Sequence, residues 1–194
     1  MSKFSSDFIP AEAASLADEN ALLRASLAEA RQRIAALEQG SDNDPLTGLP
    51  TRGRVIEELE RVVGQAERHG TPAALLTIDI KRLGGINAAH GEIGGDAVLV
   101  HVTRSLSALI RTTDLLARTG GGEFALILDH LDLDSAIETG ERISRCIASS
   151  PVDLGGRSFA IAASVGVTGI ISGDSVADVL ARAEKAIAFA KSEG

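Results

Sequence analysis

The stretch RTGGGEFALIL, residues 118–128, decides the fold because it sets three consecutive glycines directly before an apolar run. The glycines at 120–122 can take the positive φ angles that a tight turn needs. The flanking segments, DLLART at 114–119 and EFALIL at 123–128, have the composition of β-strands. The stretch therefore predicts a β-hairpin whose turn is followed by a single acid, Glu123.

Helical and strand patterns alternate on both sides of this hairpin. Helical patterns cover residues 52–69, 96–111, 135–147 and 176–191, and apolar strand patterns cover residues 73–80 and 158–170. This order predicts an α/β fold in which helices flank a central, mainly antiparallel sheet, rather than a purely parallel doubly wound sheet.

Composition narrows the possible functions. The chain has 194 residues and 44% hydrophobic content, enough for one well-buried domain and an appendage. The absence of Trp and Tyr and the net charge of −8 argue against a nucleic-acid partner. A single cysteine, Cys146, excludes an internal disulfide and a cysteine metal cluster. Because the sequence has no signal-peptide or bilayer-spanning run, we expect a cytoplasmic protein without membrane insertion.

A heptad pattern marks residues 11–40, a segment rich in Ala, Leu, Glu and Arg. One core position holds Leu16, Leu23, Ala30 and Leu37, and the other holds Asn20, Leu27 and Ile34. We expect a flexible N-terminus over residues 1–10, a coiled-coil dimerisation helix over 11–40 and a domain over 41–194. A single amphipathic helix packed on its own domain is the alternative.

Five segments of the domain follow one another in a distinctive order and spacing. They are DPLTGLPTR (44–52), IDIKRLGGINAAHGEIGGDAVL (78–99), RTTDLLARTGGGEF (111–124), SVGV (164–167) and AEKAIAFAKSEG (183–194). In this combination the domain resembles the GGDEF domain of diguanylate cyclases. The resemblance implies a palm-like fold related to nucleotide cyclases, in which two GTP-loaded domains condense their substrates into cyclic di-GMP. It also implies that a coiled coil sets the geometry of the dimer.

The resemblance identifies Asp79 and Glu123 as remnants of the catalytic and metal-binding site. Family members hold two divalent cations, typically Mg²⁺, between closely placed carboxylates. Asp79 matches the first metal ligand, but the third position of the turn, which supplies the other carboxylate, is Gly122. Lys81 stands where a second acid is expected. We therefore expect a degenerate GGDEF domain with no intact catalytic residues and only a weak metal site at Asp79 and Glu123.

Other positions of the same pocket are partly kept. Departures from the family pattern occur at Gly84, Ala88 and Glu92, whereas Asn87 and Asp96 match the guanine-reading pair and Lys191 matches a phosphate-contacting lysine. We expect GTP to bind weakly, if at all, and without turnover. No cofactor is required, and Mg²⁺ would enter only with bound GTP.

A second site of the family is better kept. Many members bind cyclic di-GMP at an inhibitory RxxD motif, and RTTD at residues 111–114 has the expected distance from the glycine turn. Arg111 would bind phosphate and the guanine edge, Asp114 would accept hydrogen bonds from guanine, and Arg142 would be the third contributor. A surface ion pair without ligand is the alternative.

The favoured prediction is thus an inactive, dimeric receptor for cyclic di-GMP that signals to an unidentified protein partner. Two alternatives stay open at this point. One is a weakly active diguanylate cyclase that uses Asp79 and Glu123 with Mg²⁺. The other is a coiled-coil scaffold that acts without a ligand.

Overall fold

The computed structural model describes Leu23 and residues 42–192. The chain divides into two units, residues 1–41 and residues 42–194. Leu23 is helical and exposed. The predicted flexible segment 1–10 and the rest of the predicted coiled-coil helix 11–40 lie outside the described residues, so both stay predictions.

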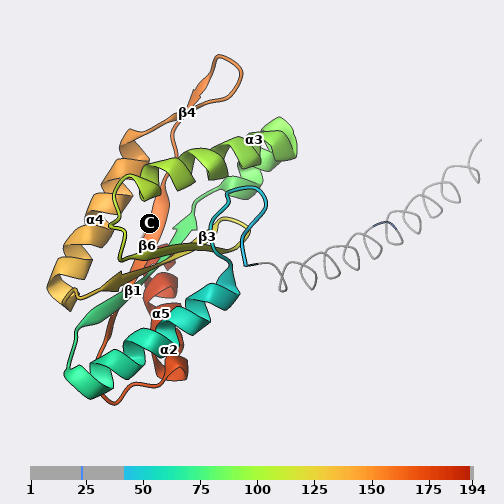
Figure 1. The fold of residues 1–194 in the computed structure, drawn as a ribbon. Helices are drawn as coiled ribbons and strands as arrows, with labels where there is room; N and C mark the ends of the chain where they lie inside the picture. The colour runs from blue at the N-terminus through green and yellow to red at the C-terminus, as the bar shows by residue number, and fades with distance from the viewer. Residues whose placement is uncertain (1–22, 24–41, 193–194) are drawn as a thin grey trace, which may run out of the picture. The chain divides into compact units, whose positions relative to one another are not determined.

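A four-stranded sheet forms the centre of the second unit, with the strand order β2–β3–β1–β6 (Figure 1). Its strands are β1 (Ala73–Ile80), β2 (Leu115–Gly120), β3 (Glu123–Asp129) and β6 (Ala163–Ile170). Every neighbouring pair in this sheet is antiparallel. A separate two-stranded sheet pairs β4 (Val152–Asp153) with β5 (Ser158–Phe159).

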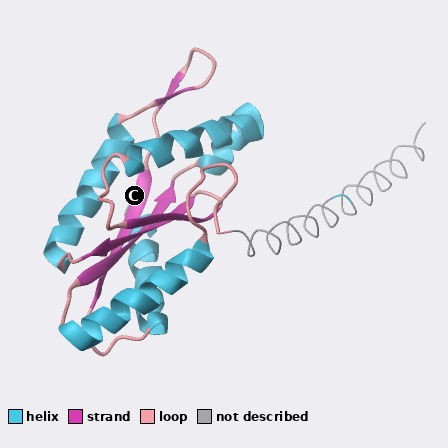
Figure 2. Ribbon diagram, in the orientation of Figure 1, coloured by secondary structure: helices cyan, strands magenta, loops and turns pink. Residues whose placement is uncertain are grey.

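Helices cover both faces of the central sheet. They are α2 (Arg52–His69), α3 (Leu83–Ser107), α4 (Leu133–Ser149) and α5 (Val176–Ser192). Figures 1 and 2 show α3 and α4 on one face and α2 and α5 on the other. The α/β fold with an antiparallel sheet flanked by helices is therefore confirmed. Among the helices that the structure describes, none is both long and apolar enough to cross a bilayer.

Alternation along β1 builds the two hydrophobic cores. Leu76, Ile78 and Ile80 belong to the core under α3 and α4, whereas Ala73 and Leu75 belong to the core under α2 and α5. Successive side chains of a strand point to opposite faces, which explains this division. Asp79 continues the second series, so its carboxylate lies on the face that α2 and α5 cover.

The predicted helix over residues 96–111 is wrong at both ends. The helix α3 begins at Leu83, contains a kink at Gly91 (φ 71°, ψ 179°) and ends at Ser107. The first half of α3 is not predicted from the sequence, because residues 83–95 contain five glycines and glycine has a low helix propensity. Leu109 and Ile110 pack against the core from the loop that follows, and Arg111 lies in that loop.

The other boundaries differ less. The strand predicted over residues 158–170 is two strands, because β5 pairs with β4 and only β6 joins the central sheet. The helix predicted over 135–147 extends to Leu133–Ser149, and Asp132 caps its first turn by accepting a hydrogen bond from the Ser135 amide. The helix predicted over 52–69 and the strand predicted over 73–80 have the observed bounds.

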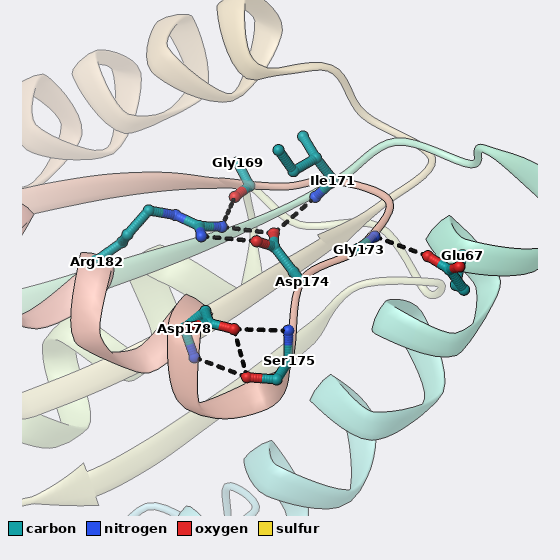
Figure 3. A network of polar contacts seen from close by, with 8 residues as sticks. All are labelled: Glu67, Gly169, Ile171, Gly173, Asp174, Ser175, Asp178 and Arg182. Atoms are coloured by element: carbon teal, nitrogen blue, oxygen red, sulfur yellow. Dashed lines mark hydrogen bonds and ion pairs between the residues drawn. The ribbon is translucent and has the colours of Figure 1, made fainter.

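A polar network fixes the start of α5 (Figure 3). Ser175 and Asp178 form a capping box, in which each side chain accepts a hydrogen bond from the other residue's amide (3.1 and 3.2 Å). The Arg182 guanidinium donates to both carboxylate oxygens of Asp174 (2.7 and 2.6 Å) and to the Gly169 carbonyl (2.9 Å). The helix that carries Lys191 is thereby joined to β6.

The loop before α5 is also joined to α2. The Glu67 carboxylate accepts hydrogen bonds from the Ser172 hydroxyl (2.9 Å) and the Gly173 amide (2.7 Å), the latter drawn in Figure 3. These two hydrogen bonds lower the pKa of Glu67. The α2 and α5 helices are thus connected at one end of the sheet.

Candidate functional sites

The glycine turn between β2 and β3 has the conformation that its sequence predicts. Gly120 and Gly121 have φ angles of 149° and 46°, which only glycine adopts readily. The Arg118 guanidinium donates to the Gly121 carbonyl through Nε (3.1 Å) and Nη2 (2.8 Å). The shape of the turn is therefore fixed by its backbone and by one arginine.

The same arginine connects the turn to the segment before α2. Arg118 Nη1 lies 2.9 Å from Oδ2 of Asp44, and both side chains are mostly buried. Asp44 also accepts hydrogen bonds from the Thr47 amide (2.8 Å) and the Thr47 hydroxyl (2.6 Å). Burial raises the pKa of Asp44, but the hydrogen bonds from Thr47 and Arg118 outweigh it, so that the pKa is lowered overall.

Asp79 and Glu123, the two acids predicted to be remnants of the metal site, lie side by side on neighbouring strands. Asp79 and Glu123 are direct partners in the β1–β3 register. The Lys191 ammonium of α5 lies 3.1 Å from the Asp79 carboxylate and 3.6 Å from that of Glu123. Burial works to lower the pKa of Lys191, and the two carboxylates raise it by more. One fixed positive charge thus lies against both acids.

The position of the missing acid faces an apolar side chain. A Cβ atom added at Gly122 would lie 3.0 Å from Leu83 Cδ2 and 3.5 Å from Ile80 Cβ. The Gly122 carbonyl accepts a hydrogen bond from the Ile80 amide (3.0 Å). The backbone of the turn is therefore intact, while a side chain at residue 122 would press against Leu83.

The two residues predicted to read guanine lie on α3, on either side of its kink. The Asn87 amide lies directly over Gly95, where an added Cβ would be only 1.8 Å from Asn87 Oδ1. Asp96 follows Gly95 directly in the chain. The side chains of Asn87 and Asp96 are both exposed. Gly95 is thus needed for the close approach of Asn87.

Arg111, Asp114 and Arg142 line one pocket at the other end of the hairpin. Its volume is about 220 Å³. The Asp114 carboxylate accepts a hydrogen bond from the Arg111 amide (2.8 Å), and the Asp114 amide donates to the Arg111 carbonyl (3.1 Å), so the loop has a fixed shape. Within residues 42–192, neither the Arg111 nor the Arg142 guanidinium makes a hydrogen bond or an ion pair. Both are free to bind an anion.

The scan against protein families decides the identity of the domain. The model described as "Diguanylate cyclase, GGDEF domain" matches residues 41–194. The chain belongs to the GGDEF family of diguanylate cyclases.

Relatives of this GGDEF domain are enzymes and signalling proteins of greater length. Diguanylate cyclase DgcP from Pseudomonas aeruginosa is 34% identical over 151 residues, which are 78% of this chain and 22% of DgcP. The response regulator PleD from Caulobacter vibrioides is 33% identical over 154 residues, which are 78% of this chain and 34% of PleD. The chain therefore spans about a fifth to a third of the length of these relatives.

Solved structures of GGDEF domains match in three dimensions. The coiled coil and GGDEF domain of DgcB from Caulobacter crescentus, solved in complex with c-di-GMP, has a TM-score of 0.75 and 27% identity, and the match covers 93% of this chain and 96% of that one. Diguanylate cyclase SiaD from P. aeruginosa, solved in complex with its activator SiaC, has a TM-score of 0.75 and 31% identity over 96% of this chain and 72% of SiaD.

The Mg²⁺ ions implied by the family do not fit the residues of this GGDEF domain. A two-cation clamp needs several carboxylates directed at the metals. Here Asp79 and Glu123 share the Lys191 ammonium, and Gly122 has no side chain that could bind a cation. Among the described residues, no group of three or more His, Cys, Asp or Glu side chains could hold a metal ion.

Sequence reasoning missed several residues of the 220 Å³ pocket. Ser135, Glu138 and Thr139 of α4 line it together with Arg142, and Asp129 of β3 forms part of its wall. The four α4 residues follow the spacing of one helix face, so the helical period could have found them from Arg142. No local pattern marks Asp129.

A second cavity of about 290 Å³ lies between α2, the sheet and α5. Its lining is mostly apolar, and Asp79 and Glu123 belong to it. No local sequence pattern indicates this cavity, because α2 and α5 are more than 100 residues apart in the chain.

Proposed function

We propose that this GGDEF domain is a receptor for cyclic di-GMP that does not synthesise it. The free guanidinium groups of Arg111 and Arg142, directed at one pocket, carry this proposal. Two arginines suit the two phosphates of a cyclic dinucleotide, because each guanidinium can donate paired hydrogen bonds to phosphate oxygens. Asp114 would accept hydrogen bonds from the guanine N1–H and amino group.

The size of the pocket agrees with partial enclosure of such a ligand. Its 220 Å³ is below the range of about 300–1,000 Å³ typical of sites that enclose a small molecule. The pocket would therefore hold one guanine and its phosphate, with the rest of the ligand outside. Support also comes from DgcB, whose GGDEF domain was solved in complex with c-di-GMP.

The charges at the turn support the part of the proposal that concerns synthesis. Family chemistry needs carboxylates that hold cations against the reacting phosphates. In this domain the Lys191 ammonium already offsets part of the charge of Asp79 and Glu123, and Gly122 supplies no third carboxylate. Asn87 and Asp96 would still allow weak binding of GTP.

A dimer and a protein partner complete the proposal. The heptads of residues 11–40 would form a parallel coiled coil between two copies. The similar diguanylate cyclase SiaD was solved in complex with its activator SiaC, and this supports a protein partner for the present GGDEF domain. Sedimentation of the full chain beside a chain that starts at Asp42 tests the dimer, and we expect only the full chain to be dimeric.

The deciding experiment is isothermal titration calorimetry of the full chain with cyclic di-GMP, with GTP as comparator. We expect binding by the wild type and its loss in Arg111→Ala and Arg142→Ala. Arg145→Ala is the matched control, since Arg145 is an exposed arginine of the same helix that pairs with Glu141 outside the pocket (3.2 Å). No heat with the wild type, or unchanged binding by Arg111→Ala, would contradict the proposal.

A weakly active diguanylate cyclase is the second candidate, favoured by the enzymatic relatives such as DgcP. Its test is the formation of cyclic di-GMP from GTP with Mg²⁺ or Mn²⁺ in a verified dimer. We expect no product. A scaffold that needs no ligand would instead bind its protein partner equally well with and without cyclic di-GMP, and equally well as Arg111→Ala.

A further inference from the structure

Asp129 is a buried acid in the wall of the proposed ligand pocket. It is the last residue of β3, and it is 9% exposed. Its Oδ1 accepts a hydrogen bond from the His130 amide (2.9 Å) and lies 2.9 Å from His130 Nδ1. Its Oδ2 accepts a hydrogen bond from Arg61 Nη2 (2.7 Å). Both oxygens are therefore engaged by donors from outside the pocket lining.

Arg61 reaches this carboxylate from the other face of the sheet. It belongs to α2, whereas the pocket is lined by residues of α4, the end of β3 and the loops beside it. Figure 1 shows α2 and α4 on opposite faces of the sheet. Its guanidinium is shared between Glu58 and Asp129, and Arg61 is not itself a lining residue. Hydrogen bonds to these two acids, with that to Glu58 the stronger, raise its pKa further above the usual range.

The charges of the pocket explain why this contact matters. Two arginines line it, Arg111 and Arg142, against three acids, Asp114, Asp129 and Glu138. By itself this set is negative and would repel a ligand with two phosphates. A buried carboxylate that is left unpaired has a strong and poorly screened field. The Arg61 guanidinium, which Glu58 shares, offsets part of the Asp129 charge and so weakens this repulsion.

We propose that Arg61 raises the affinity of the pocket for anions without touching the ligand, by offsetting part of the charge of Asp129. This inference rests on the proposed function, because it takes the pocket to bind a cyclic dinucleotide. Arg61 is a positioning residue in this scheme. It holds the Asp129 carboxylate toward α2 and leaves Arg111 and Arg142 as the effective charges that the phosphates meet.

The test is calorimetry of the full chain with cyclic di-GMP for a double-mutant cycle. We expect Arg61→Ala to bind about tenfold more weakly than the wild type, because Asp129 then keeps its contacts with His130 but loses its arginine partner. Asp129→Asn should bind at least as tightly as the wild type, and Arg61→Ala with Asp129→Asn should recover the affinity of Asp129→Asn. Arg61→Lys, which keeps the charge, should lose less than Arg61→Ala.

Arg54→Ala is the matched control. It removes an arginine from the same helix, where Arg54 pairs with the exposed Glu57 and lines no part of the pocket. Equal binding by Arg61→Ala and Arg54→Ala would overturn the inference, and so would equal weakness of Arg61→Ala and the double variant. If the wild type itself does not bind, the proposed function fails and this inference fails with it. Binding by the wild type without the rescue overturns this inference alone.

Discussion

The β2–β3 hairpin has a site at each end, and the two sites treat their charged groups differently. At the turn, Asp79 and Glu123 both contact the Lys191 ammonium, so the charges satisfy one another within the chain. At the open end, Arg111 and Arg142 line a pocket with guanidinium groups that no described residue engages. A site whose charges are already paired has little to offer a ligand, whereas unpaired arginines have much.

The largest effect on the open-end pocket is expected when Asp114 is removed. Asp114→Ala loses both the proposed guanine acceptor and the hydrogen bond that fixes the Arg111 amide. We expect the affinity for cyclic di-GMP to fall by about 2 kcal/mol or more, roughly thirtyfold. Calorimetry checks this, with Asp134→Ala as the control, because Asp134 is an exposed acid of α4 outside the pocket. Equal affinities of the two variants would refute a role for Asp114.

A larger residue between α5 and β6 should lower the stability of the domain without affecting ligand binding at the open-end pocket. A Cβ atom at Gly166 would lie 2.6 Å from the Ile187 amide nitrogen, so Gly166→Ala must push α5 away from β6. We expect a cost of about 1–3 kcal/mol and a Tm lower by several degrees. Because α5 does not line the open-end pocket, cyclic di-GMP binding should persist below the Tm.

Gly169→Ala is the control for that experiment. A Cβ at Gly169 would lie 3.6 Å from Leu133, an ordinary contact. Its Tm should stay close to that of the wild type. A Gly166→Ala protein with an unchanged Tm would show that α5 is not held against β6 as described.

The ion pair between Arg118 and Asp44 should make the stability of the domain depend on pH. The pKa of Asp44 is lowered from its ordinary 3.8 on folding, so its contribution to stability is present above about pH 4 and is lost as the pH falls through the lowered value. We expect Asp44→Asn to lower the free energy of unfolding by about 1 kcal/mol at pH 7. The difference from the wild type should shrink near pH 3. Urea unfolding at both pH values measures it, and a constant difference would contradict the assignment.

The smallest effect is expected at Lys191. Lys191→Gln removes the ammonium from between Asp79 and Glu123, and the pairs are exposed enough to contribute only about 0.2–1 kcal/mol to stability. Mn²⁺ binding, followed by electron paramagnetic resonance, should become stronger in this variant, because the two carboxylates are then free for a cation. Lys185→Gln, a lysine of the same helix without such a contact, is the control. Equal Mn²⁺ binding by both would show that Lys191 does not block the site.

Sequence predicted the parts of this fold whose signals are local. The helix Arg52–His69 and the strand Ala73–Ile80 show clear apolar periods and end at turn residues. The first half of α3 was missed, since its glycines carry almost no helical signal. Packing across the kink of α3 requires two of them, as Gly94 and Gly95 lie against His90 and Asn87 of the same helix.

The sites divide in the same manner. Arg111, Asp114 and Arg142 can be predicted as a group because the family motif fixes their spacing, and the structure brings them to one pocket. The contact between Arg61 and Asp129 joins residues 68 positions apart, which no local pattern reveals. The position of Lys191 against both acids likewise depends on how α5 packs beside the hairpin.

The three glycines of the turn differ in how freely mutation can replace them. Gly120 and Gly121 are held by positive φ angles, so any side chain there strains the backbone. Residue 122 has no such constraint, and only the Leu83 side chain limits what it can be. Residue 122 can therefore gain a side chain at the cost of a small shift of Leu83, while the backbone of the hairpin, on which the other pocket depends, keeps its shape.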